Sequence, residues 1–455
     1  MKKTKRPTSH IIKLEKITDY SSPLTKTLNA RLDSPAIKRM KTFSSLLKSF
    51  HLKNTVTTDV NGRKVTIDGK EVINFSSANY LGFDQHEEVI KAAISGLKNL
   101  GNHSGCSRIF SSHENIIRLE EETSKLVGSE ASMICANVSH THTGVIPALF
   151  SNEESEIFID RYAHTSLHQA SLIAVAKGAT LTRVDISDLK ETGRIISSSK
   201  KAHKTVLIDG LYSMQGNIPE IPKLQELCNL HDCILYVDDA HGLGIYGENG
   251  GGVVEHFNLS FENMILVGSY QKGLGAFGAF VAGPQALIDF LRVTSKSYIF
   301  SGTLQPQSVE GALKAIEISS SDEGRELRNL LWAKSKYIRS ELANMGYKVI
   351  SQFCDSPIIS VEIGDDLKTI MAGRKIYDCG VYLNSVMYPA VPKNGGILRI
   401  SLNSIHSAED IEALLGAFNK LSADILTKKS IVTSPIKNLI AIGKSHIQGE
   451  DYNGL

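Results

Sequence analysis

Three short apolar runs in the middle of the chain constrain its fold more than any other feature of the sequence. They are residues 204–209 (KTVLID), 233–238 (CILYVD) and 263–268 (NMILVG), with helix-like segments such as 223–231 between them. This spacing is typical of strand–helix–strand units with parallel strands. Because the runs are continuously apolar rather than alternating, we expect the strands to be covered on both faces.

Polar residues stand at the ends of these predicted strands. Asp209 and Asp238 each end a run, and Ser269 follows the third run. In open parallel sheets, ligands bind outside the carboxyl ends of the strands. The sequence therefore predicts that these three residues share one ligand site.

The pattern changes near residue 306, where a long helical region leads into a mixture of strands and helices that runs to about residue 421. This part predicts a smaller α+β domain. Near the N-terminus, residues 64–75 predict a hairpin whose turn is Asp68-Gly69, and residues around 36–49 predict an amphipathic helix. We divide the chain into an N-terminal segment (1–60), a large ligand-binding domain (61–305), a small C-terminal domain (306–427) and a polar tail (428–455).

The composition argues against several classes of partner and location. Lys and Arg number 50 against 48 Asp and Glu, a balance that argues against nucleic acid or an anionic membrane surface as the main partner. The basic start of the chain is not followed by a signal-peptide core, and no apolar run reaches the length of about 18 residues that a membrane span needs. The six cysteines are scattered without a CxxC pair, as expected for free thiols in a reducing cytoplasm.

Lys272 is the first candidate for chemistry. It lies in the segment Gly268–Gly275 (GSYQKGLG), and an apolar stretch follows it. Glycines let the backbone approach a ligand closely, and an apolar environment favours the neutral amine of a lysine. A neutral amine can form a Schiff base with an aldehyde cofactor. By itself, the same segment could also be a surface glycine loop.

The segment Val237-Asp238-Asp239-Ala240-His241-Gly242 is the second candidate. A carboxylate at a strand end can keep a pyridine nitrogen protonated, which makes the ring an electron sink. His241 can donate a hydrogen bond to a phenolic oxygen or move protons. Two other interpretations stay open, namely a capped strand end and a divalent-metal site. No HExxH or CxxC motif supports the metal.

Three further segments carry weaker signals. Residues 137–144 (NVSHTHTG) offer amides and hydroxyls where a helix could begin, and such a terminus binds phosphate. The pair His140 and His142 could suggest zinc, but no further ligands accompany it. His164 stands alone as an imidazole, and Arg399 has strand-like neighbours from which it could bind a carboxylate bidentately.

Together these segments resemble the α-oxoamine synthases, a branch of the fold-type I enzymes that use pyridoxal 5'-phosphate (PLP). The resemblance covers about residues 60–425. It rests on eight motifs in family order: Asn79-Tyr80-Leu81-Gly82, Ser107-Arg108, His164-Thr165-Ser166, Asp209-Gly210-Leu211-Tyr212-Ser213-Met214, Asp238-Asp239-Ala240-His241-Gly242, Ser269-x-x-Lys272, Phe300-Ser301-Gly302-Thr303-Leu304 and Leu398-Arg399-Ile400-Ser401.

The resemblance implies an α/β fold like that of aspartate aminotransferase. It has a large domain with a mostly parallel seven-stranded sheet and a smaller α+β C-terminal domain. It also implies a homodimer with active sites at the subunit interface. The reaction implied is a decarboxylative condensation of an amino acid with an acyl thioester, carried by coenzyme A or a carrier protein, which gives an aminoketone.

The resemblance assigns roles to residues of this sequence. Lys272 resembles the Schiff-base lysine and the base, Asp238 the partner of the pyridinium nitrogen, His241 the neighbour of the phenolic oxygen, and His164 the imidazole stacked on the ring. These four are the implied catalytic residues. The other implied cofactor-binding residues are Val138, Ser139, Asp209, Ser213, Ser269, Ser301 and Thr303. Asn79 and Arg399 are the residues implied to bind the substrate carboxylate.

The sequence departs from the family pattern near the cofactor. Ala163 replaces a usual Asn, Asn137-Val138-Ser139 replaces a Ser-Gly/Cys-aromatic turn, His142 replaces a frequent Asn, and Gly273 replaces a frequent Ala. These changes suggest a divergent member with its own substrates, such as those of a specialised lipid, signal or secondary metabolite. The alternatives are an aminotransferase on the same fold, a non-catalytic partner subunit of a synthase, and a metal-dependent hydrolase that uses Asp238, Asp239 and His241.

Overall fold

The structure is a computed structural model of the whole chain. It describes residues 22–33, 47–48, 51–52, 55–58, 60–103, 105–351 and 355–425. Most of the helix predicted around 36–49, and the whole tail 428–455, lie outside the described residues. Within them, no helix combines the length and the apolar character that crossing a membrane requires.

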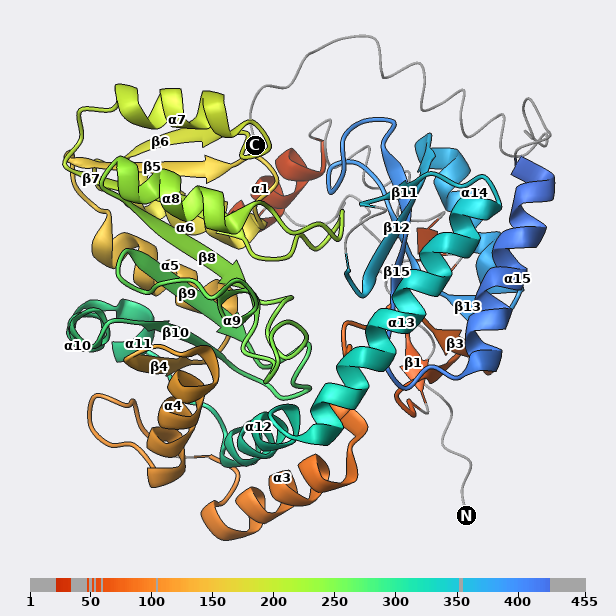
Figure 1. The fold of residues 1–455 in the computed structure, drawn as a ribbon, viewed down its shortest axis with the longest axis horizontal. Coiled ribbons are helices and arrows are strands. Elements are labelled where there is room, and N and C mark those ends of the chain that lie inside the picture. The colour runs from red at the N-terminus through yellow and green to blue at the C-terminus, as the bar shows by residue number, and fades with distance from the viewer. Residues whose placement is uncertain are drawn as a thin grey trace.

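A seven-stranded sheet forms the centre of the larger part of the molecule (Figure 1). Its strands are β4 (Ala131–Cys135), β5 (Ser155–Asp160), β6 (Thr180–Val184), β7 (His203–Asp209), β8 (Cys233–Asp239), β9 (Met264–Ser269) and β10 (Ala279–Gly283). Their spatial order is β4-β10-β9-β8-β7-β5-β6. Only β10 runs antiparallel to its neighbours, so the predicted mostly parallel sheet is confirmed.

Helices cover both faces of this sheet, as the continuous apolar strands predicted. They are α5 (Val138–Leu149), α6 (Thr165–Val175), α7 (Leu189–Ser198), α8 (Ile221–Leu230), α9 (Val253–Phe257), α10 (Gln285–Thr294) and α11 (Lys296–Ile299). Alternate residues of β8 belong to two separate core clusters. Leu235 and Val237 pack with α7, α8 and α9, whereas Tyr236 packs with α5, α6, α10 and α11.

The smaller part of the molecule is built on a four-stranded sheet with the order β11-β12-β15-β14. Its strands are β11 (Val349–Ile350), β12 (Ile358–Gly364), β14 (Asn384–Val386) and β15 (Gly396–Ser401), and its helices are α14 (Asp366–Asp378) and α15 (Ala408–Ile425). The helices α12 (Pro306–Ser319) and α13 (Asp322–Asn344) connect the two parts, and α13 spans the space between them (Figure 1). The predicted α+β character is confirmed, while the domain boundary at residue 305 stays a prediction.

The N-terminal region contributes to both parts: residues 57–74 join the small part, and residues 87–127 pack against α12 and the large sheet. It contains α1 (Pro23–Leu32), which the sequence reasoning did not foresee, then β1 (Thr57–Thr58), β2 (Lys64–Ile67), β3 (Lys70–Asn74), η1 (Phe83–Gln85), α3 (Glu87–Leu100) and α4 (Glu114–Val127). The predicted hairpin is present, with positive φ angles at both Asp68 and Gly69. Its strand β3 pairs in parallel with β13 (Val381–Tyr382), so this sheet links the beginning and the end of the chain.

One buried histidine illustrates how tightly the small part is packed. His406 stacks on Phe75 with ring centroids 4.0 Å apart, and its two nitrogens pair with the Asn403 amide at 3.0 Å and the Asn74 carbonyl at 3.1 Å. Burial lowers the pKa of His406 to about 4, although the Asn74 carbonyl opposes this. His406 is therefore a neutral structural group near pH 7, away from the strand ends of the large sheet.

Candidate active site

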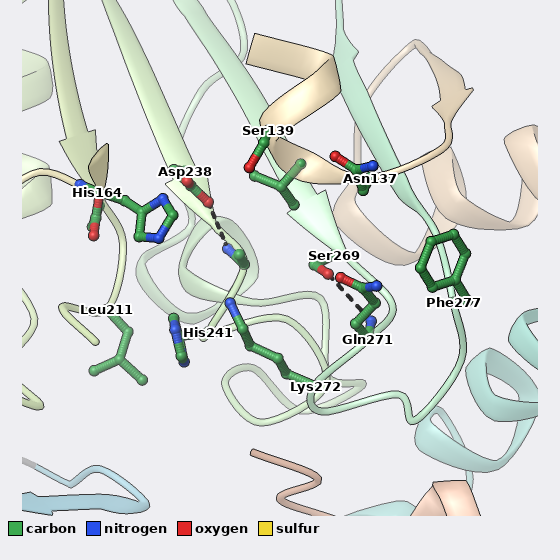
Figure 2. A pocket seen from close by; sticks show the side chains of 13 residues that line it. Asn137, Ser139, His164, Leu211, Asp238, His241, Ser269, Gln271, Lys272 and Phe277 are labelled. Atoms are coloured by element: carbon green, nitrogen blue, oxygen red, sulfur yellow. Dashed lines mark hydrogen bonds between the residues drawn. The ribbon is translucent and has the colours of Figure 1, made fainter. Parts of the chain in front are cut away.

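A cavity of about 330 Å³ opens at the carboxyl ends of the large sheet's strands (Figure 2). Asp209 ends β7, Asp238 lies at the end of β8 and Ser269 ends β9, so the predicted meeting of these three residues is confirmed. The residues that line the cavity are Asn137, Val138, Ser139, His164, Asp209, Leu211, Asp238, Ala240, His241, Ser269, Gln271, Lys272 and Phe277.

One end of the cavity is suited to an anion. Helix α5 begins there, and its N-cap Asn137 accepts a hydrogen bond from the amide of His140 at 2.9 Å. The first amides of a helix have no partner within it and carry the positive end of the dipole. Val138 and Ser139 supply such amides, and Ser269 adds a hydroxyl from β9. Backbone and hydroxyl groups together therefore form a phosphate-binding end.

Lys272 extends from the turn after β9 toward Asp238 and His241 (Figure 2). Burial lowers its pKa, although the charges of Asp238 and Asp209 oppose the shift. The backbone at Gly273 explains why this position carries no side chain: an added Cβ would lie 2.2 Å from the Leu243 carbonyl oxygen. The turn that carries Lys272 thus rests directly on the turn that carries His241.

Two buried carboxylates with different electrostatics share the cavity. Burial alone would raise the pKa of Asp238, but His142 and Lys272 bring it below its usual value, so Asp238 is ionised. Burial and then the charge of Asp238 raise the pKa of Asp209 well above its usual value. Asp209 Oδ1 accepts a hydrogen bond from the His164 amide at 3.0 Å. The ionised group is therefore Asp238, and Asp209 positions the backbone of His164.

Two histidines face the same cavity. His164 caps α6, and its Nδ1 lies 2.7 Å from the Ser166 hydroxyl. Partial burial lowers its pKa, although Asp238 opposes the shift. Burial, followed by the charges of Lys272 and Arg399, lowers the pKa of His241 well below its usual value. Both rings are therefore neutral near pH 7 and can serve as hydrogen-bonding or stacking groups.

Five of the residues that the sequence singled out do not line this cavity. Arg399 lies behind it on β15, where its Nε donates to the Ser213 carbonyl at 2.6 Å. Asn79 donates to Asp84 at 2.8 Å. Ser301 donates to the Ser297 carbonyl at 2.6 Å, and the buried Thr303 hydroxyl has no hydrogen-bond partner. Ser213, Arg399, Asn79 and the 301–303 loop are therefore not part of the cavity lining.

Three residues outside the cavity lining, to which the resemblance gave no role, are linked to it by hydrogen bonds. Tyr80 places its hydroxyl 2.7 Å from Nδ1 of His241, although its motif was quoted only for Asn79. His142 and Tyr236 lie below Asp238 and are completely or almost completely buried.

The metal interpretation of Asp238, Asp239 and His241 does not fit the geometry. Asp238 and Asp239 are successive strand residues, so their side chains point to opposite faces. Asp239 accepts from the Val253 amide at 2.8 Å, and added Cβ atoms on Gly210, Gly242 or Gly252 would collide with its carboxyl group. Within the described residues, no group of three or more His, Cys, Asp or Glu side chains could hold a metal ion.

The cavity does fit PLP. The phosphate would lie at the α5 terminus with Ser269, the ring nitrogen at the ionised Asp238, and the aldehyde carbon near the amine of Lys272. His164 approaches from the side opposite Ser269 in Figure 2, where it can lie against a ring placed between these groups. The ionised Asp238 would also pair with a protonated ring nitrogen placed against it.

Comparisons with known proteins agree with this fit. The aminotransferase class I and II family matches residues 70–418. The chain is 34% identical over 367 residues to the 8-amino-7-oxononanoate synthase of Petrotoga mobilis, covering 80% of this chain and 92% of that protein. It is also 34% identical over 351 residues to the serine palmitoyltransferase of Sphingobacterium spiritivorum, covering 77% and 86%.

Solved structures share the fold. The serine palmitoyltransferase of Sphingomonas wittichii superposes with a TM-score of 0.80 at 24% identity, covering 87% of this chain and 98% of that one. Another serine palmitoyltransferase with the same TM-score and identity was solved with PLP. With two 34% identical relatives from one branch and the family match across most of its length, this chain belongs to the α-oxoamine synthases, PLP-dependent enzymes of the class I and II aminotransferase family.

Proposed function

We propose that this enzyme joins an amino acid to an acyl thioester, with loss of carbon dioxide, to give an α-aminoketone. The observation that carries the proposal is the buried amine of Lys272, which faces the ionised Asp238 across a cavity with a phosphate-binding end. The names of the relatives, 8-amino-7-oxononanoate synthase and serine palmitoyltransferase, support the reaction class. We place the reaction in the cytoplasm, where free thiols such as Cys228 and Cys233 persist.

Asp238 and Lys272 have separate roles in the proposed reaction. Bound PLP supplies an electron-poor ring that stabilises negative charge at the α-carbon of the amino acid. Asp238 holds a proton at the ring nitrogen because its carboxylate is buried and ionised. Lys272 would hold the cofactor by its aldehyde, and its desolvated amine is suited to accept the α-proton of the substrate.

The substrate carboxylate would bind beside this amine. Arg399 is buried, yet its charge reaches Tyr80, His241 and Lys272. Its Nε and Nη1 are paired with the Ser213 carbonyl and the Ser401 hydroxyl, which hold the guanidinium in place. A fixed guanidinium can receive a carboxylate without first being ordered, so Arg399, with Asn79 beyond it, is our proposed carboxylate site.

We further propose that the enzyme is a homodimer whose partner subunit completes each site. Phe110 and Phe300 are 85% and 81% exposed, and Phe277 at the cavity is 51% exposed. Ser107 and Gly302 form a bridge that brings the loops of Phe110 and Phe300 together. Such exposed aromatic groups favour burial in a protein interface. The 301–303 loop lies in this surface, where it can reach a partner's phosphate rather than its own.

The homodimer is tested by the mass of the protein in solution. Wild-type protein is expected to have twice the chain mass of 49.7 kDa by light scattering. Phe300→Ser is expected to shift the protein toward the monomer and to lower activity, because an exposed aromatic anchor is lost. The matched control is Leu230→Ser, which changes a residue with 74% exposure at the end of α8. A wild-type monomer with full activity would contradict the proposal.

The reaction is tested with carboxyl-labelled amino acids and a panel of acyl thioesters that includes pimeloyl and palmitoyl chains. The expected result is one carbon dioxide and one free thiol released for each turnover, with an aminoketone as product. An aminotransferase would instead convert the amino acid to an oxo acid and release no thiol. A subunit without activity of its own would release neither product with any pair of substrates. Best turnover with the pimeloyl thioester would overturn the idea of a divergent substrate.

A further inference from the structure

A buried histidine lies directly beneath the carboxylate that faces the cavity. His142 is on α5, one turn below the phosphate-binding end, and none of its surface is exposed. Its Nε2 lies 2.8 Å from Oδ2 of Asp238, and its Nδ1 lies 2.8 Å from the hydroxyl of Tyr236. Tyr236 is on β8, two residues before Asp238, and is fully buried as well. The three groups form a continuous chain of hydrogen bonds.

An ionised Asp238 constrains the protons in this chain. An ionised carboxylate can only accept, so Nε2 of His142 must carry a hydrogen atom. With a neutral imidazole, the lone pair of Nδ1 accepts the hydroxyl hydrogen of Tyr236; with both nitrogens protonated, Nδ1 donates to the Tyr236 oxygen instead. The other oxygen of Asp238 accepts from the Ala240 amide at 3.0 Å. In either case His142 donates to Asp238 and is held by Tyr236.

A reversed chain would suit only a protonated Asp238. In that case the carboxyl group would donate to Nε2, and Nδ1 would donate to the Tyr236 oxygen. Tyr236 can donate or accept, but as a phenol it has one hydrogen atom, and among the described residues its hydroxyl is hydrogen-bonded to His142 alone. Burial raises the pKa of the Tyr236 hydroxyl well above its usual value, so it keeps its hydrogen atom and is available as the donor.

We infer that His142 is a positioning residue, held by Tyr236, that keeps the Asp238 carboxylate ionised and aimed at the ring nitrogen of the cofactor. The inference rests on the proposed function, because Asp238 has a ring nitrogen to meet only in a PLP site. His142 does not touch the cavity, so it acts through Asp238 alone. A leucine at position 142 would leave one carboxylate oxygen buried without a donor, which costs a charged group heavily.

The test compares His142→Leu, His142→Asn and Tyr236→Phe with wild type, all loaded with PLP. The readouts are the absorption spectrum of the bound cofactor and the rate at which the α-proton of the amino acid exchanges with solvent deuterium. His142→Leu is expected to slow exchange by about 10- to 100-fold, as for a lost hydrogen bond to a charge. The KM of the amino acid should change little. His142→Asn retains a donor and should recover part of the rate.

The coupling between the two residues provides a sharper criterion. Tyr236→Phe is expected to slow exchange less than His142→Leu. It removes the hydrogen bond that holds the imidazole but leaves the imidazole next to Asp238. Adding Tyr236→Phe to His142→Leu should have no further effect, because Tyr236 acts through the ring that is already gone. Should His142→Leu fail to fold, Tyr236→Phe and His142→Asn still carry the comparison of spectra and exchange rates.

The matched control is His406→Asn. It removes another buried imidazole with two hydrogen bonds, but one that lies away from the cavity. It is expected to lower the melting temperature without changing the spectrum or the exchange rate. If the His142 and Tyr236 variants match this control, the two residues are only structural and the inference is wrong. A wild-type protein that neither binds PLP nor exchanges any α-proton would instead overturn the proposed function.

Discussion

Lys272→Ala is expected to lower kcat by about 10³-fold or more, since proton transfer by a positioned side chain contributes about 10²- to 10⁴-fold and covalent attachment of the cofactor is lost as well. The structure gives Lys272 both tasks because its amine is buried, carries a lowered pKa and points to the middle of the cavity. PLP should still bind through the phosphate-binding end at Val138 and Ser139, but without a covalent bond.

Borohydride reduction followed by peptide mapping checks this prediction. Wild-type protein should lose its yellow colour on reduction and carry the cofactor on Lys272, whereas Lys272→Ala should carry it on no residue. Lys272→Arg keeps a positive charge of similar reach and should be as inactive as Lys272→Ala. Small primary amines added to Lys272→Ala should restore part of the proton exchange. A reduced adduct on another lysine in wild-type protein would refute the site assignment.

Asp238→Asn is expected to have the second largest effect, a loss of about 10²- to 10³-fold in kcat/KM, as for the removal of one group that stabilises charge in a buried site. The substitution keeps the shape of the side chain but removes its charge. A pyridine nitrogen next to it would then no longer be stabilised in its protonated form. Because the charge of Asp238 opposes the low pKa of Lys272, its removal should leave the lysine neutral.

Lys272→Ala and Asp238→Asn can be told apart by whether the cofactor is still attached to the protein after reduction. Reduction of Asp238→Asn should still place the cofactor on Lys272, while the α-proton exchange of the amino acid becomes slow. The matched control is Asp239→Asn on the same strand. Burial raises the pKa of Asp239 to about 8, although the Val253 amide opposes this, so Asp239 is mostly neutral at pH 7 and the substitution changes little charge. Equal losses in the two variants would count against a special role for Asp238.

Much of the fold could be predicted because strands of the large sheet are continuous apolar runs that end in a polar residue. The run 233–238 is apolar throughout and ends in Asp238, and the structure places β8 over the same residues plus one. The smaller α+β part was predicted equally well from periodicity. Helix α1 was missed because it is mostly exposed, and an exposed short helix leaves little apolar pattern to detect.

From the strand pattern alone, the candidate site could be predicted only where a residue stands at the end of a strand. Asp209, Asp238 and Ser269 met the cavity as expected. Tyr80 and His142 were missed for the same physical reason. Each reaches the site by a side-chain contact with a distant segment, as Tyr80 does with His241 across 161 positions. Local spacing carries no record of such a contact, and only the folded chain brings the two segments together.

The pairing of β3 with β13 has a mechanical consequence. It ties residues 70–74 to residues 381–382, and the Ser401 and Ser404 amides donate to the carbonyls of Phe75 and Tyr80 as well. Tyr80 and Arg399 therefore lie in one hydrogen-bonded region, whereas His241 and Lys272 follow strands of the large sheet. Tyr80 contacts His241 through its hydroxyl at 2.7 Å, and Arg399 donates to the Ser213 carbonyl at 2.6 Å. Two side chains of this region therefore also tie it to the loops at the carboxyl ends of the large sheet.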